Sequence, residues 1–145
     1  MNAMNIKYED VPAEYIYCLK KDCPLAAHCL HSIAADLAVQ VGIESFMVYN
    51  PDKVDATENC PHYRSDTPVT VKLGMARFFD QLPYKAVRNL RSTFENHFGH
   101  TQFHRIKHGQ LDITPSMQAY IQSQLNQQGI TTPPLYDGEA DRIMW

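Results

Sequence analysis

Residues 83–109, PYKAVRNLRSTFENHFGHTQFHRIKHG, decide the fold because they predict two helices in direct succession. The apolar positions that recur at steps of three and four residues are Val87, Leu90, Phe94 and Phe98. This periodicity predicts a helix that Gly99 ends, and then a second, short helix that Thr101 caps and that runs to His108. The C-terminal half of the chain is therefore expected to be helical.

The flanking sequence extends this interpretation in both directions. Thr114-Pro115 combines a capping residue with a proline at the first helical position, and predicts a third helix that ends at Gly129. We expect residues 130–145 to be irregular, with Trp145 packed as an anchor on the domain. Upstream, apolar and polar residues alternate over 69–73, which predicts a half-buried strand.

Length and composition indicate one folded domain. The chain has 145 residues, of which 44% are hydrophobic and 20% charged, so general disorder is excluded. We expect a mainly helical α+β fold with short strands, in which a cysteine-rich half (1–74) packs on a three-helix segment (75–129) followed by the tail (130–145). The sequence shows no secretory signal and no apolar stretch of spanning length, so we expect a cytoplasmic protein with no membrane partner.

Four cysteines form the most informative group of side chains: Cys18, Cys23, Cys29 and Cys60. Three lie within residues 18–29, and such clustering in a reducing compartment points to a metal rather than to a disulfide. Four thiolates suit a tetrahedral structural zinc site, which leaves no open position for water. A helix predicted over 24–41 would turn Cys29 back toward the loop, and Lys20 and Lys21 would offset the negative charge.

Other interpretations of the cysteines stay open. An iron–sulfur cluster uses the same four thiolates, although the usual ferredoxin spacings are absent. His28, His31 and His62 could each replace a cysteine as ligand. Free cysteine is also among the most buried residue types and can simply fill a core. A nucleophilic Cys60 paired with His62 lacks an orienting group, so we do not expect an enzyme.

Charge is distributed unevenly along the chain. Within a net charge of −3, residues 1–71 balance at −5, residues 72–110 at +5 and residues 111–145 at −3. The basic block indicates either a surface for an anionic partner or a face that pairs with the acidic flanks. The acidic tail, residues 137–141, is the segment that would cover it.

The two successive helices resemble a helix-turn-helix, in which the second helix enters the major groove of DNA. Basic residues of the first helix would lie along phosphates, and the second helix would offer side chains that pair with bases. The candidate nucleic-acid-binding residues are Lys85, Arg88, Arg91, Gln102, Arg105, Lys107 and His108. Three amphipathic helices with solvated cations are equally typical of any small helical domain.

Short motifs along the whole chain carry a resemblance to a known family. They are Cys18, Cys23-Pro24, Cys29-Leu30, Asn50-Pro51, Cys60-Pro61, residues 103–109, Thr114-Pro115, residues 136–139 and Trp145. With these features the chain resembles an uncharacterised family of short proteins from anaerobic gut bacteria, a domain of unknown function. The resemblance implies cytoplasmic residence and the cysteine quartet, and it supplies no activity or ligand.

Three hypotheses for function follow from these features. The first is a zinc-stabilised cytoplasmic protein that binds DNA or another anionic partner and has a regulatory role. The second is a protein-interaction adaptor without catalytic activity, which predicts an exposed apolar patch or a homo-oligomer. The third is an iron–sulfur or thiol redox sensor.

Overall fold

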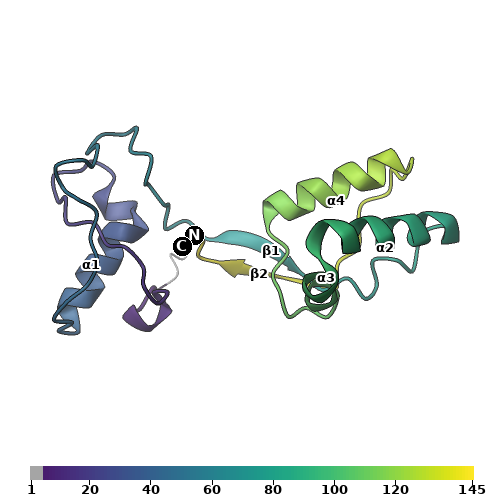
Figure 1. The fold of residues 1–145 in the computed structure, drawn as a ribbon, viewed down its shortest axis with the longest axis horizontal. Helices are drawn as coiled ribbons and strands as arrows, with labels where there is room; N and C mark the ends of the chain where they lie inside the picture. The colour runs from purple at the N-terminus through teal and green to yellow at the C-terminus, as the bar shows by residue number, and fades with distance from the viewer. Residues whose placement is uncertain (1–4) are drawn as a thin grey trace. The chain divides into compact units, whose positions relative to one another are not determined.

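The computed structural model describes residues 5–145, in which four α-helices and a two-stranded antiparallel sheet give an α+β fold (Figure 1). This confirms the expected fold class. The contacts divide the chain into two compact units. The N-terminal unit extends to Val69 and also includes Ile143–Trp145, while the C-terminal unit comprises Thr70–Arg142.

The N-terminal unit is built around α1 (Leu30–Gln40), with short 3-10 helices at Tyr8–Asp10 and Ala26–His28. Small residues on one side of α1 are buried against a group of aromatic side chains. The members of this cluster include Ala34, Ala35, Ala38, Tyr8, Tyr15, Tyr17, Phe46 and Trp145. The Trp145 ring meets Tyr15 edge to face at 5.2 Å, so the predicted anchoring of the last residue on the protein is confirmed.

The helix predicted over 24–41 begins later than expected, because α1 starts at Leu30. Cys29 is extended, with φ −98° and ψ 123°, and it pairs with Ser65 in an antiparallel bridge. The Leu30 amide donates to the Arg64 carbonyl at 2.8 Å. Because the backbone of Cys29 and Leu30 is hydrogen-bonded to the segment at Arg64 and Ser65, the helix cannot extend back to Pro24. The expectation that Cys29 lies within the helix is therefore wrong.

The C-terminal unit combines the sheet with three helices. The strands are β1 (Val69–Leu73) and β2 (Gly138–Arg142), and the helices are α2 (Tyr84–Phe98), α3 (His100–Lys107) and α4 (Pro115–Gln127). Their shared core contains Met75, Phe78, Phe79, Leu90, Phe94, Phe103, Ile106, Ile113, Ile121 and Leu125. The strand at 69–73 and the three helices match the sequence-based expectation, and the residues between β1 and α2 form turns.

The helix boundaries follow their capping residues. The Thr114 hydroxyl accepts the Met117 amide at 3.4 Å, as the Thr-Pro signal predicts. The predicted cap at Thr101 is wrong, because α3 begins at His100 and Gly99 precedes it. Gly99 has φ +86°, a conformation that glycine adopts at no steric cost. It therefore ends α2 and allows α3 to start one residue later.

The C-terminal tail corrects a third expectation. Residues 130–145 were expected to be irregular, yet β2 pairs with β1. The strand is held by polar contacts, since Lys72 and Glu139 form an ion pair at 2.7 Å and the Thr70 hydroxyl donates to Asp141 at 2.8 Å. Most of its side chains are exposed, so it lacks the apolar alternation by which strands are identified.

None of the helices in residues 5–145 is long and apolar enough to cross a membrane.

Candidate functional site

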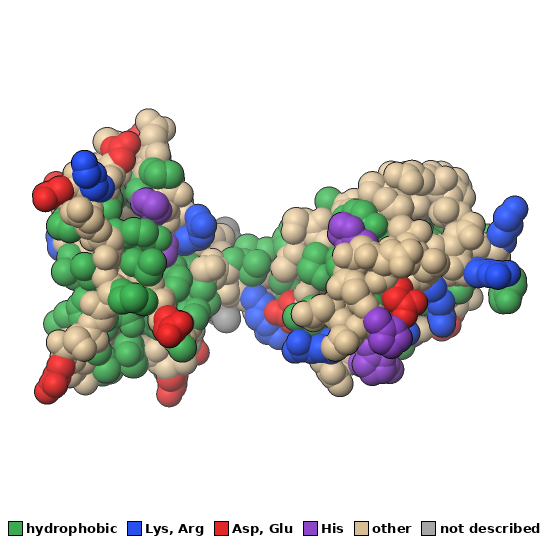
Figure 2. Space-filling view, viewed as in Figure 1, with side chains coloured by type: hydrophobic (Ala, Val, Ile, Leu, Met, Phe, Trp, Pro, Cys, Tyr) green, Lys and Arg blue, Asp and Glu red, His purple; other side chains and the backbone are tan. Residues whose placement is uncertain are grey.

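The candidate nucleic-acid-binding residues lie on the surface of α2 and α3. Lys85, Arg88 and Arg91 are exposed along α2, and Gln102 and Arg105 are exposed on α3. His108 follows α3 and is exposed, while Lys107 is half-buried. Figure 2 shows Lys, Arg and His side chains spread over the visible face of this unit, with Lys and Arg at both of its ends. We refer to these seven residues as the basic surface.

The cations of the basic surface have no acidic partner in the described part of the chain. Among residues 5–145, no carboxylate lies within 4.0 Å of Lys85, Arg88, Arg91, Arg105 or Lys107. Two of the five lie over aromatic rings instead. The Arg91 guanidinium is 4.8 Å from the centre of the Phe79 ring, and the Lys107 ammonium is 5.1 Å from the Phe103 ring. These contacts position the side chains and leave their charge uncompensated.

The acidic tail does not cover this surface. The Asp137 carboxylate accepts the backbone amides of Ala76 and Arg77 at 2.9 and 3.0 Å. Glu139 and Asp141 bind partners on β1, as described above. All three carboxylates of the tail are thus bonded to β1 and the turn after it. The acid on α2, Glu95, is bonded to His100.

The connection between α2 and α3 is a single residue, Gly99. A helix-turn-helix uses a turn of three to four residues. The order of the helices agrees with that motif, while the connection is shorter. The charge and exposure of the basic surface therefore support a nucleic-acid role more than the helix geometry does.

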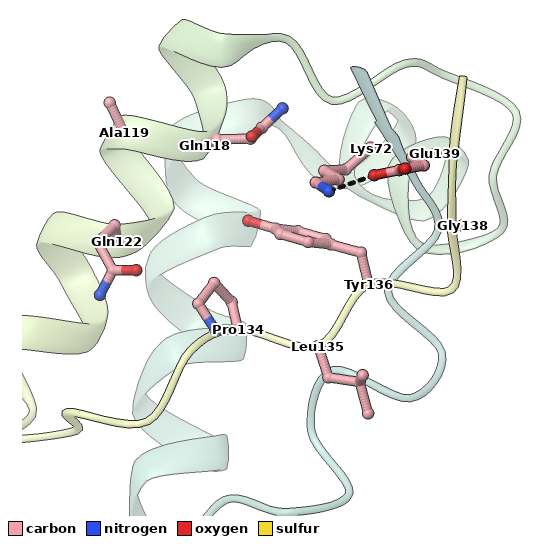
Figure 3. A pocket seen from close by; sticks show the side chains of 9 residues that line it. All are labelled: Lys72, Gln118, Ala119, Gln122, Pro134, Leu135, Tyr136, Gly138 and Glu139. Atoms are coloured by element: carbon pink, nitrogen blue, oxygen red, sulfur yellow. Dashed lines mark hydrogen bonds and ion pairs between the residues drawn. The ribbon is translucent and has the colours of Figure 1, made fainter. Parts of the chain in front are cut away.

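A cavity of about 670 Å³ lies between α4 and the segment that leads into β2. Figure 3 shows Tyr136 pointing toward α4, with Gln118 and Gln122 beside its hydroxyl group. That hydroxyl is buried and has no hydrogen-bond partner among the residues that the structure describes. Burial raises the pKa of Tyr136 to about 12, so the phenol stays protonated at neutral pH and cannot act as a base there. Sequence reasoning missed this cavity, because the motif at residues 136–139 does not indicate that Tyr136 faces α4.

All four cysteines lie in the N-terminal unit, half-buried and without disulfides. Backbone contacts bring parts of their segments together, since the Cys18 amide donates to His31 and Cys29 pairs with Ser65. Even so, within residues 5–145 no three His, Cys, Asp or Glu side chains lie close enough together to hold a metal ion. The thiols are thus not gathered around one point in residues 5–145, and the zinc ion and the iron–sulfur cluster stay predictions.

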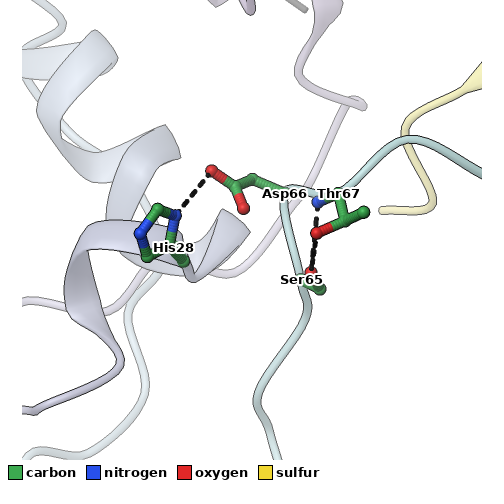
Figure 4. A network of polar contacts seen from close by, with 4 residues as sticks. All are labelled: His28, Ser65, Asp66 and Thr67. Atoms are coloured by element: carbon green, nitrogen blue, oxygen red, sulfur yellow. Dashed lines mark hydrogen bonds and ion pairs between the residues drawn. The ribbon is translucent and has the colours of Figure 1, made fainter. Parts of the chain in front are cut away.

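The groups expected to support the metal have other partners. Lys21 forms an ion pair with Asp36 of α1. His31 is buried, and its Nδ1 donates to the Ile16 carbonyl at 2.6 Å. In Figure 4, His28 reaches Asp66, with 3.2 Å between Nδ1 and Oδ2, beside the Ser65–Thr67 contacts. This network joins Ala26–His28 to the segment that pairs with Cys29, which is a structural role.

A row of four rings in the same unit runs from half-buried Tyr15 to exposed His62. Tyr15 and His31 are parallel at 4.6 Å, and Tyr49 contacts both His31 and His62. Burial lowers the pKa of His31 and raises that of Tyr15 to about 12, with the nearby Cys29 thiol adding to the rise. Both groups are therefore uncharged at neutral pH, and the stack offers packing rather than acid–base chemistry.

The comparisons with known proteins give one match. Searches against curated proteins and against solved structures found none. The model of a family of unknown function, DUF6078, matches residues 1–145. The chain therefore belongs to the DUF6078 family.

Proposed function

We propose that the C-terminal unit binds nucleic acid through the basic surface, in a cytoplasmic protein with a regulatory role. The observation that carries the proposal is the lack of any carboxylate beside its five cations among residues 5–145. Cations that are already neutralised within a protein add little to phosphate binding, whereas free ones release counterions from the nucleic acid.

The composition of the surface fits phosphate and base contacts together. Arginine offers a planar fork of donors that matches phosphate oxygens, and lysine offers a mobile point charge. Gln102 and His108 supply further polar groups on the same unit, and glutamine pairs well with adenine. The C-terminal unit thus presents cations that can bind the phosphates of a nucleic acid and polar groups that can hydrogen-bond to its bases.

Binding of a fluorescently labelled 20-nucleotide oligomer to the full chain tests this proposal. We expect saturable binding that the triple variant R88A/R91A/R105A reduces at least tenfold. Lys53→Ala, which removes an exposed cation from the N-terminal unit, is the matched control and should leave affinity unchanged. Absence of binding by the native chain, or equal binding by the triple variant, would refute the proposal.

A protein-interaction role is the second candidate, and a specific observation favours it. The N-terminal unit exposes several large apolar side chains, namely Leu19, Val39, Val41, Met47 and Val48. Figure 2 shows hydrophobic side chains over much of its visible face. Surfaces of this kind are typical of interaction sites, including contacts between copies of one chain. Light scattering at rising concentration separates a stable homo-oligomer from a monomer.

The structural zinc ion stays a prediction that is independent of the basic surface. The presence of four free cysteines in one unit supports a zinc site. Within residues 5–145, however, their side chains do not converge on a single point. Elemental analysis of protein purified without air distinguishes the cases. One zinc per chain supports the prediction, iron supports the cluster alternative, and a metal-free folded chain with four reactive thiols contradicts both.

A further inference from the structure

Tyr84 has no structural role that explains its position. The ring is 84% exposed, more than any other large hydrophobic side chain in residues 5–145. It belongs to neither core cluster, and no aromatic ring of the described chain lies against it. Tyr84 is the first residue of α2 and stands directly beside Lys85 of the basic surface.

Tyr84 continues a row of side chains along α2. Arg88 and Arg91 follow it by four and seven residues, a spacing that places all three on one side of a helix. At 1.5 Å per residue the row extends about 10 Å. All three side chains are exposed, and the Phe79 ring supports the guanidinium of Arg91.

The two arginines of the row carry positive charge that no nearby acid in the described residues balances. Neither arginine has a carboxylate within 4.0 Å in the described part of the chain, and the next acid on α2, Glu95, is bonded to His100. Figure 2 shows Lys and Arg side chains beside a hydrophobic one at the end of this unit where α2 begins. The Tyr84 ring and the two arginines are thus exposed on one side of α2, and Arg91 lies over the Phe79 ring.

We propose that this row binds single-stranded nucleic acid, with an unpaired base stacked on the Tyr84 ring and the flanking phosphates held by Arg88 and Lys85. The inference rests on the proposed function and narrows it to strands with unpaired bases. Bases splayed out of a helix stack on tyrosine rings and arginine planes, whereas a duplex keeps base faces inside. An acidic peptide could form ion pairs with the cations, but its carboxylates would not stack on the Tyr84 ring.

Fluorescence anisotropy of the full chain with a labelled oligothymidine of 15 nucleotides tests the inference, beside a duplex of equal length. Stacking of one base predicts that Tyr84→Ala weakens single-strand binding about 5- to 150-fold. Tyr84→Phe keeps the ring face and should bind like the native chain. Asn96→Ala, an exposed position elsewhere on α2, is the matched control.

The salt dependence separates stacking from charge. Tyr84→Ala should leave the slope of log affinity against log salt unchanged, while Lys85→Ala should reduce it by about 0.7. Three results would overturn the inference and leave the proposed function standing. Tyr84→Ala could bind the single strand as tightly as the native chain, or the native chain could prefer the duplex. Polyglutamate could also displace the labelled single strand as effectively as unlabelled single strand does. Failure of the native chain to bind either oligomer would refute both.

Discussion

Replacing Asp137 with alanine tests how the acidic tail is attached. The Asp137 carboxylate accepts the amides of Ala76 and Arg77, and its own amide donates to the Gly74 carbonyl at 3.2 Å. The side chain thus caps the turn after β1 in the way that an acidic residue caps a helix. Without it, both amides would depend on water.

The expected cost follows from these two contacts. Loss of a side-chain cap costs typically about 1 kcal/mol, and two amides lose a charged acceptor here, so we expect about 1–2 kcal/mol. For a unit of this size each kcal/mol shifts the melting temperature by roughly 4–8 °C. Asp137→Asn keeps one carbonyl oxygen and should lose about half as much as the alanine variant, on the same capping scale.

Scanning calorimetry of the full chain measures the shift. Asp141→Ala is the matched control, because it removes a single exposed contact to Thr70 and should change stability by no more than about 0.5 kcal/mol. If Asp137→Ala melted like the native chain, or lost no more stability than Asp141→Ala, the assignment of Asp137 as the capping residue would be refuted.

Three further predictions concern packing and ionisation. Gly74→Ala should destabilise the C-terminal unit, because φ is +76° and an added Cβ would collide with the Asp137 carboxylate; an unchanged melting temperature would contradict this. Phe94→Ala removes a fully buried ring and should cost about 3–5 kcal/mol, measured by urea unfolding. Spectroscopic titration of the phenols should show Tyr15 and Tyr136 ionising near pH 12, because burial raises the pKa of both phenols. Because both pKa values are raised on folding, the stability they contribute is present below about pH 10 and is lost between about pH 10 and 12.

The helical half of the fold follows directly from sequence. Leu90 and Phe94 recur at helical spacing and are buried, and Thr114-Pro115 begins α4 where the capping rules place it. These signals are local, since a helix satisfies its own backbone groups. The strand at β1 was also predictable, because Val71 is buried between exposed or half-buried neighbours.

The parts that sequence reasoning missed depend on distant partners. Whether residues before Leu30 are helical is decided by Arg64 and Ser65, which lie more than thirty residues away. β2 is held by polar pairs to β1, and a strand with exposed side chains gives no apolar pattern. Spacing alone could suggest a metal site but could not place four sulfur atoms, and the cavity beside Tyr136 has no sequence signal.

The salt dependence of single-strand binding tests the central claim most directly. Five uncompensated cations, each contributing about 0.7 to the slope, predict a log–log slope near −3.5 and an affinity that falls roughly 100-fold between 50 and 200 mM salt. A slope close to zero, or an affinity that does not change over this range, would contradict a basic surface that binds phosphates.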